Sequence, residues 1–176
     1  MHVYPAELAD VNTCYQMDKS FTTDYVWQMQ SRDGGRTLDV RFDTVRLPRS
    51  MRVAYPRAPD ELAELWRRDE CFLVVRNLED ESVGFIVAQP HSWQKLLWVS
   101  NLVVHPRYRG QGFGTNLLKA AIDWGLEHNL NRMTLELQTK NYPAICFAQK
   151  HGFQFCGYNE RYYENGDIAL FFSRSI

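Results

Sequence analysis

One stretch in the second half of the chain, residues 101–115, constrains the fold more than any other. Its sequence is NLVVHPRYRGQGFGT, in which an apolar strand end is followed by a proline, a basic glycine-rich turn and the start of an apolar-periodic helix. The glycines lack a Cβ, so a ligand can approach the backbone closely. The first N–H groups of the helix have no partners within it, and Arg107 and Arg109 add positive charge beside them. The stretch therefore predicts a site for a phosphate or pyrophosphate.

Two common phosphate-binding motifs do not fit this loop. The Walker-type pattern GxxxxGK followed by Ser or Thr does not occur in the chain. In a dinucleotide-binding GxGxxG pattern, the third glycine would fall on Thr115 or Leu117. What is present is RxxGxG, beginning at Arg109, preceded by LxVxP, beginning at Leu102. The alternative interpretation is a tight glycine-rich turn with solvated arginines.

These two patterns together resemble motif A of the GNAT superfamily of acetyl-CoA-dependent N-acetyltransferases. A second stretch, from Asn141-x-x-Ala144 through Lys150-x-Gly152-Phe153, resembles motif B of the same family. The resemblance covers about residue 71 to the end and, more weakly, the first predicted helix. Within the family, the C-terminal half is similar to streptothricin acetyltransferases, in the segments LELQ at 135–138 and ALFF at 169–172. The N-terminal third shows no comparable match.

The resemblance implies a fold of the α/β (α+β) class. This is the GNAT acyl-CoA N-acyltransferase fold, with a mixed, mostly antiparallel central sheet, splayed central strands and flanking helices. We expect a single domain over 1–176, with an acceptor-side region at 1–70 and an acetyl-CoA-binding core at 71–176. The length of 176 residues and the hydrophobic fraction of 45% suit one core.

The hydrophobic pattern predicts helices over 5–17, 59–68, 114–128 and 141–151, and the aromatic segment 21–29 is compatible with a further helix. Strands are expected over 37–45, 71–76, 83–89, 95–104, 132–138, 153–158 and 168–172, with a short one over 2–4. Residues 47–59 hold three prolines and three arginines, directly after Arg46, and predict an irregular basic connection. That connection is either a solvated loop or a lid that brings positive charge to an acidic ligand. The aromatic residues Phe21, Tyr25 and Trp27 are expected in the core, although the resemblance also puts this region beside the acceptor.

The resemblance implies that coenzyme A lies between the splayed strands, with its pyrophosphate in the glycine-rich loop. The Val103 or Val104 backbone N–H is expected to hold the thioester carbonyl, and Asn141 to reach the pantetheine chain. The cofactor site implied in this way comprises Leu102, Val103, Val104, Arg109, Gly110, Gln111, Gly112, Phe113, Gly114, Thr115, Asn141, Ala144 and Phe147.

Acetyl transfer to an amine requires the amine to lose a proton, the oxyanion to be stabilised and the thiolate to leave. Glu136 is the candidate base, and its alternative role is a structural carboxylate bonded to a neighbouring loop. Asn101 is placed to orient a water but cannot take a proton. The family's motif B tyrosine, which protonates the thiolate, aligns with Phe147, so the acid is Tyr142, Tyr158 or solvent. A catalytically silent acetyl-CoA-binding module also remains compatible with Phe147.

We expect the acceptor to be a primary amine of a small molecule, with a protein N-terminus or lysine as the alternative. Pairing of acceptor-site carboxylates from Asp39, Asp43 and Glu136 would favour a cationic acceptor such as an antibiotic. The aromatic C-terminal strands are suited to pairing across a homodimer.

The net charge of −1 gives no indication of nucleic-acid or membrane partners. We see no apolar run of about 18 residues and no signal peptide, and the histidines show no metal-ligand spacing. The four cysteines have apolar neighbours and predict buried free thiols in a reducing, cytoplasmic setting. They are Cys14, Cys71, Cys146 and Cys156.

Overall fold

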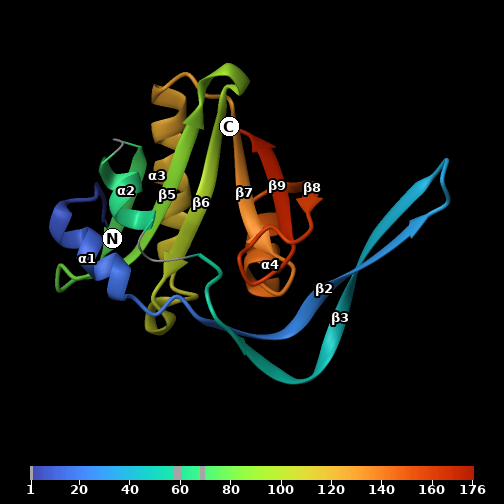
Figure 1. The fold of residues 1–176 in the computed structure, drawn as a ribbon. Coiled ribbons are helices and arrows are strands. Elements are labelled where there is room, and N and C mark those ends of the chain that lie inside the picture. Colours follow the sequence, from blue (N-terminus) through green and yellow to red (C-terminus); the bar gives the residue numbers. More distant parts are fainter. Residues whose placement is uncertain (1, 58–60, 68–69) are drawn as a thin grey trace.

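The computed structural model describes residues 2–57, 61–67 and 70–176. Seven strands form one sheet in the order β1-β4-β5-β6-β7-β9-β8, and β2 pairs with β3 in a separate two-stranded sheet (Figure 1). Neighbouring strands are antiparallel except β6 and β7, which are parallel. The elements are β1 (His2–Pro5), α1 (Leu8–Gln16), β2 (Phe21–Asp33), β3 (Leu38–Val53), α2 (Glu61–Arg67), β4 (Cys71–Arg76), β5 (Ser82–His91), β6 (Leu96–Val104), α3 (Phe113–Glu127), β7 (Arg132–Gln138), α4 (Tyr142–Lys150), β8 (Gln154–Asn159) and β9 (Ala169–Ser175).

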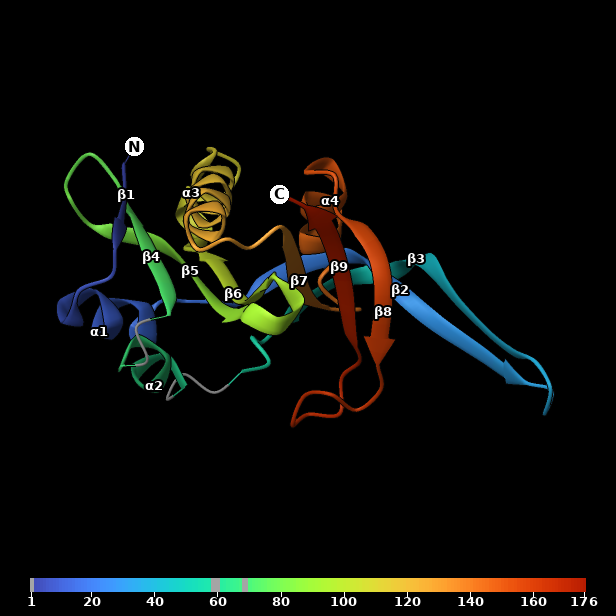
Figure 2. The ribbon, with the colours of Figure 1, turned by 90° about the horizontal axis from the view of Figure 1, so that it is seen from above.

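The large sheet is the middle of three layers. Helices α3 and α4 cover one face, and α1 and α2 cover the other (Figure 2). Alternate side chains of β5 serve the two layers, because successive residues of a strand point to opposite faces. Ile86 belongs to the core beneath α3 and α4, whereas Phe85 and Val87 belong to the core beneath α1 and α2. The expected mixed, mostly antiparallel sheet flanked by helices is therefore confirmed.

Most predicted elements from residue 61 onward are confirmed within one or two residues, and the predicted helix ends at residues 59–60 and 68 lie outside the described residues. The bounds of β4 and β7 agree with the prediction, and α2 turns Leu62 and Leu65 into the core. Asn129 adopts the left-handed conformation expected after α3, with φ of 59°. Gly125 packs closely, since a Cβ there would lie 3.0 Å from the Ile176 Cδ1 atom.

The N-terminal region departs from the prediction in two elements. Residues 2–5 form a strand, and Pro5 pairs with Leu73 instead of opening a helix, which begins only at Leu8. The segment 21–29 is not a helix but part of β2. Its aromatic side chains pack across the hairpin and onto the body: the Trp27 ring lies 6.0 Å from Phe42 and 5.6 Å from Phe172. This tertiary packing decides between two conformations that the local pattern allowed.

The predicted irregular connection over 47–59 is also corrected, because β3 continues to Val53. Pro48 is tolerated there because residues 47–50 lie opposite a single residue, Asp24, at a bulge in the pairing register. No regular ladder bond needs the missing proline N–H at that point. The hairpin of β2 and β3 is therefore long, and its outer half projects from the body of the molecule (Figure 1).

The four cysteines do not share one environment. Cys14 and Cys71 are buried as expected, but Cys146 and Cys156 are exposed, which corrects the prediction for those two. Their sequence neighbours are apolar, yet they lie on the outward faces of α4 and of the edge strand β8. No helix in the described part of the chain is long and apolar enough to cross a membrane.

Candidate active site

The two central strands, β6 and β7, separate half-way along their length. They pair from Leu96 with Arg132 to Val99 with Leu135, and the register ends there. The next residue of β6, Ser100, is a bulge, because Val87 of β5 pairs with Asn101 while Ala88 pairs with Val99. A bulge bends the strand that carries it. Beyond this point a cavity of about 470 Å³ lies between the strands.

The cavity runs from the glycine-rich loop to the connections of the N-terminal region, where Lys19, Phe21 and Tyr55 line it. It contains most of the residues that the sequence predicted for the site. These are Leu102, Val103, Val104, Arg109, Gly110, Gly112, Gly114, Thr115, Glu136, Asn141, Ala144 and Phe147. Four residues predicted for the site are not among the described residues that line the cavity. They are Asn101, Gln111, Phe113 and Tyr142.

The backbone of β6 offers hydrogen-bonding groups to this cavity. The His105 N–H donates to the Val83 carbonyl at 2.9 Å, which makes this a hydrogen-bonded pair of the ladder with β5. Such pairs alternate with non-hydrogen-bonded ones along antiparallel strands. With the register observed, the N–H groups of Leu102 and Val104 point away from β5 toward the gap. The Val103 N–H points toward β5 instead.

The glycine-rich loop leaves the first turn of α3 accessible. Gly110 and Gly112 have φ of 76° and 91°, and no atom lies within 4 Å of a Cβ placed on either. Gly112 is the N-cap of α3 and, having no side chain, makes no capping hydrogen bond to the N–H groups of that helix. Arg109 donates from Nε to the Val104 carbonyl at 2.8 Å, which joins the loop to β6. The loop is thus an open anion site at a helix start.

Gln111 and Phe113 point away from this anion site. Gln111 is exposed and donates its amide to the Arg107 carbonyl at 3.0 Å. Phe113 is buried in the core, with its ring 5.8 Å from that of Tyr108. Their side chains shape the loop, and only their backbone can face a ligand.

Helix α4 forms the opposite wall of the cavity. Asn141 caps it, because its Oδ1 accepts from the Ala144 N–H at 3.2 Å, and Phe147 lines the cavity one helix turn further on. His151 Nε2 lies 3.2 Å from Thr115 Oγ1, which ties the end of α4 to the start of α3. Tyr142 is elsewhere: its ring lies 5.2 Å from Tyr25 of the hairpin. The structure therefore does not bring this candidate acid to the cavity.

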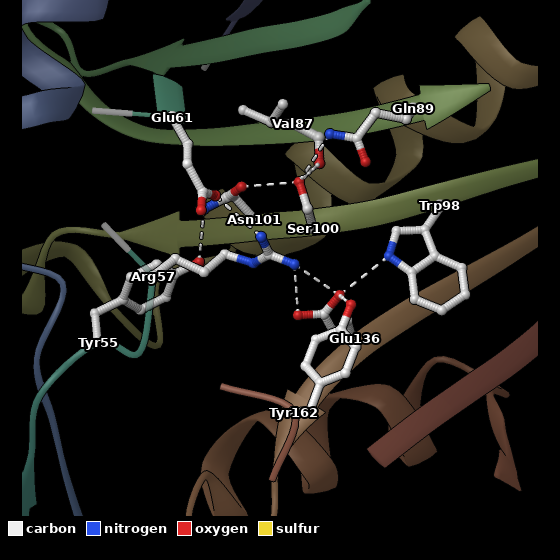
Figure 3. A network of polar contacts seen from close by, with 10 residues as sticks. All are labelled: Tyr55, Arg57, Glu61, Val87, Gln89, Trp98, Ser100, Asn101, Glu136 and Tyr162. Carbon is white, nitrogen blue, oxygen red and sulfur yellow. Dashed lines mark hydrogen bonds and ion pairs between the residues drawn. The ribbon is translucent and has the colours of Figure 1, made fainter. Parts of the chain in front are cut away.

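Glu136 is buried in an ion pair. Its side chain has no exposed area, and its two oxygens lie 2.7 and 2.8 Å from Arg57 Nη2. Oε2 also accepts from the Trp98 indole at 3.1 Å and from the Tyr162 hydroxyl at 2.9 Å (Figure 3). Arg57 in turn holds Glu61 at 3.0 Å. A carboxylate bonded in this way is anchored, and accepting a proton would break the contacts that anchor it.

Asn101 joins β6 to the same connection. Its Oδ1 accepts from the Ser100 hydroxyl at 2.8 Å, and its Nδ2 donates to the Tyr55 hydroxyl at 2.8 Å (Figure 3). Tyr55 was not identified from the sequence as a site residue, and Arg57 was included only in a stretch predicted to be a solvated loop or a basic lid. Both residues follow the long strand β3. The one sequence signal for a further hydroxyl was Phe147, which stands where the family has a tyrosine and cannot donate a proton.

The sequence model of the Acetyltransferase (GNAT) family matches residues 42–153, which is more than half of the chain. The chain belongs to the GNAT acetyltransferase family. It is an acetyl-CoA-dependent N-acetyltransferase, and its sheet and helices share the fold of a solved acetyltransferase.

Similar proteins extend this likeness over the whole chain. A streptothricin acetyltransferase of Streptomyces lavendulae is 28% identical over 96% of this chain and 91% of its own. The crystal structure of a nourseothricin acetyltransferase, 25% identical, covers 99% of this chain and 97% of its own with a TM-score of 0.84. A second solved structure, of a Bacillus anthracis protein in complex with acetyl coenzyme A, shares the fold at 20% identity. It covers 99% and 97% of the two chains, with a TM-score of 0.76.

Proposed function

We propose that this GNAT enzyme transfers the acetyl group of acetyl-CoA to a primary amine of a cationic small molecule of the streptothricin class. The observation that carries the proposal is the end of pairing at Val99 and Leu135, which opens a cavity beside the glycine-rich loop. The near full-length similarity to streptothricin acetyltransferases supports the acceptor class. Free cysteines and the use of acetyl-CoA fit a cytoplasmic setting.

Acetyl-CoA is proposed to lie along the cavity with its pyrophosphate at the start of α3. There the N–H groups that follow Gly112 are free to donate to phosphate oxygens. Three cationic side chains, Lys19, Arg109 and Lys150, line the cavity, against one carboxylate among the described lining residues. This balance of charge suits a coenzyme that carries several phosphates.

The extended arm of the coenzyme then runs beside β6 toward the point where the strands join. The free N–H groups of Leu102 and Val104 are the donors for its amides and for the thioester carbonyl. In the tetrahedral intermediate that oxygen carries negative charge, which a fixed N–H donor stabilises. This assigns the oxyanion contact to Leu102 or Val104 and not to Val103, whose N–H points toward β5.

The acceptor is proposed to enter beside Tyr55, Arg57 and Glu136. Arg57 lies between Glu61 and Glu136, so these three groups carry one net negative charge that attracts a cationic amine. Asp39 and Asp43, which the sequence suggested as further acceptor carboxylates, lie on the projecting hairpin and are not among the described residues lining the cavity. The attraction therefore rests on Glu61 and Glu136.

Thermal unfolding with excess acetyl-CoA, ATP or NAD tests the coenzyme site. A ligand at about 100 times its dissociation constant should add about 2.7 kcal/mol to the free energy of unfolding. We expect this rise with acetyl-CoA alone. An equal rise with ATP would mean that the loop is a generic phosphate site, and the function would be withdrawn.

Release of the coenzyme A thiol then tests the acceptor. We expect turnover with streptothricin to exceed turnover with a peptide N-terminus or a lysine-containing peptide by at least tenfold in kcat/KM, which corresponds to about 1.4 kcal/mol. Preference for either peptide would replace the small-molecule acceptor by a protein.

A further inference from the structure

The family's usual donor to the departing thiolate is missing from this cavity. Phe147 stands at the position of the motif B tyrosine and lines the cavity, but a phenyl ring has no proton to donate. Tyr142, the nearest tyrosine in sequence, packs on Tyr25 and does not line the cavity. A sulfur that leaves with a negative charge is stabilised by a hydrogen-bond donor. Another donor among the described residues that line the cavity would replace the missing tyrosine.

Most donors in the cavity are engaged or belong to the phosphate end. Thr115 and His151 lie against each other at the start of α3. Lys19 donates to the Tyr15 and Met17 carbonyls at 2.8 and 3.2 Å. The Ser100 hydroxyl donates to Asn101 Oδ1 at 2.8 Å.

Tyr108 also belongs to the phosphate end, because it lies in the short 3-10 turn Pro106–Tyr108 that leads into the glycine-rich loop. Its oxygen accepts from Asn77 Nδ2 at 3.2 Å, outside the gap between β6 and β7. Among the described residues that line the cavity, Tyr55 carries the remaining hydroxyl.

Tyr55 lines the cavity near the point where β6 and β7 separate, with its hydrogen available. It lines the cavity together with Val99 and Leu135, the last pair before β6 and β7 separate. Its oxygen accepts from Asn101 Nδ2 at 2.8 Å, so the phenol hydrogen is not used in that bond. Among the residues that the structure describes, no hydrogen bond from this hydroxyl is formed within the protein. The hydroxyl is thus held at one side by β6 and is free to donate.

On the basis of the proposed function, we propose that Tyr55 donates a hydrogen bond to the coenzyme A sulfur as the carbon–sulfur bond breaks. The acceptor nitrogen forms the new bond to the acetyl carbon, and the electron pair of the carbon–sulfur bond stays on sulfur. The amine proton goes to solvent, and the thiolate takes a proton from solvent after release. Tyr55 keeps its own proton throughout, so it stabilises charge and is not consumed.

Two observations support a neutral, fixed phenol. Burial raises the pKa of Tyr55, so the hydroxyl stays protonated at neutral pH and remains a donor. The segment that carries it is anchored two residues further on, where Arg57 pairs with Glu136 of β7. Asn101 and Arg57 therefore act as positioning residues, one aiming the hydroxyl from β6 and the other fixing its segment to β7.

The test compares the wild type with Tyr55→Phe, which keeps the ring and removes the hydroxyl. Coenzyme A is bound to each protein, and the pKa of its thiol is measured from the ultraviolet absorbance of the thiolate. We expect the pKa of the bound thiol to be about 1–2 units higher in Tyr55→Phe, because a donor to a charged acceptor is lost. The charges of Lys19, Arg57 and Glu136 are the same in both proteins, so the difference reports the hydroxyl.

Kinetics give the second measurement. We expect kcat to fall about 10–100-fold in Tyr55→Phe with little change in the KM for acetyl-CoA, because the bond forms only as charge develops on sulfur. Asn101→Ala should give a smaller loss of the same kind. The matched control is Tyr4→Phe on β1, which removes a hydroxyl from an exposed tyrosine outside the cavity and should change neither value.

The outcomes separate this inference from the proposed function. If coenzyme A binds wild type and Tyr55→Phe equally, and both the pKa of the thiol and kcat are unchanged, Tyr55 is not the donor, although the acetyltransferase assignment stands. If coenzyme A binds neither protein by calorimetry, both proposals are overturned.

Discussion

Arg57 and Glu136 are 79 positions apart in the chain and form a two-bond ion pair of 2.7 and 2.8 Å. Glu136→Gln keeps the shape of the side chain but removes the charge that Arg57 faces. We expect the free energy of unfolding to fall by about 1–3 kcal/mol and kcat to fall by the same factor at neutral and at high pH, because the residue anchors and does not take a proton. A loss that recovers at high pH would instead restore Glu136 as the base. Glu61 is more exposed, and its only described partner is the same arginine. Glu61→Gln should therefore lower the free energy of unfolding by no more than about 1 kcal/mol.

Gly112 adopts φ of 91° directly before α3, a conformation in which a Cβ is strained. Gly112→Ala should lower the free energy of unfolding by about 1–2 kcal/mol, and it should also weaken acetyl-CoA binding because the methyl group faces the phosphate site. Gly35→Ala is the matched control, since Gly35 has φ of 77° at the tip of the hairpin with equally open space. Unfolding in urea and calorimetry with acetyl-CoA measure the two effects. Equal affinity loss in both variants would show that strain, and not position, is responsible.

Gly84 of β5 lies against the strand that we assign to the coenzyme arm. A Cβ there would come within 2.8 Å of the Val103 carbonyl oxygen and 3.3 Å of a Val104 methyl group. This oxygen belongs to the backbone and can move away only if β6 shifts. Gly84→Ala should therefore lower the free energy of unfolding by about 1–3 kcal/mol and shift β6 enough to weaken acetyl-CoA binding. Gly157→Ala on β8, where the nearest atom is at 3.7 Å, should be close to neutral. A stable Gly84→Ala protein with unchanged affinity would contradict the assignment of β6.

Asp10 links α1 to β4 and β5, through Arg76 and Ser82, and makes stability depend on pH. Burial acts to raise the pKa of Asp10, but bonds from the Ser82 hydroxyl, the Glu7 N–H and Arg76 outweigh it, and the pKa lies below its ordinary value. A lowered pKa contributes stability that is present above about pH 4, the ordinary value, and is lost as the pH falls through the folded-state value. Asp10→Asn should therefore lose about 1–3 kcal/mol at pH 7. The difference in the free energy of unfolding between the two proteins, measured in urea, should become smaller below about pH 4. A difference that does not change with pH would exclude this linkage.

The half of the fold that the sequence predicted well is the half with strong local signals. Loop glycines, the proline after β6 and the apolar stripe of α3 act within a few residues, so β4, α3 and β7 were predicted nearly to their ends. The hairpin of β2 and β3 was missed because Phe21 and Trp27 fit a helix or a strand equally well. The choice depends on Phe172, which lies far along the chain.

The cofactor side of the site was predictable for the same reason, whereas the acceptor side was not. Glu136 was named from one strand, but its partner Arg57 follows the second half of β3, which had been predicted as part of an irregular connection. Tyr55 acquires its role only through Asn101, across 46 positions. Contacts of this kind arise from the topology of the sheet and leave no mark in local spacing.

The sheet is divided where β6 meets β7, because these strands are joined by four residue pairs, from Leu96 to Val99 of β6. On one side lie β1, β4, β5 and β6, and on the other β7, β9 and β8. A coenzyme arm bonded to Leu102 and Val104 would lie like a short additional strand in the gap where β6 and β7 do not pair. The bound coenzyme would then connect the two parts of the sheet. Each turnover would begin with these added contacts and end with their loss when the coenzyme leaves. A cell rich in acetyl-CoA would accordingly keep this protein in its more resistant form.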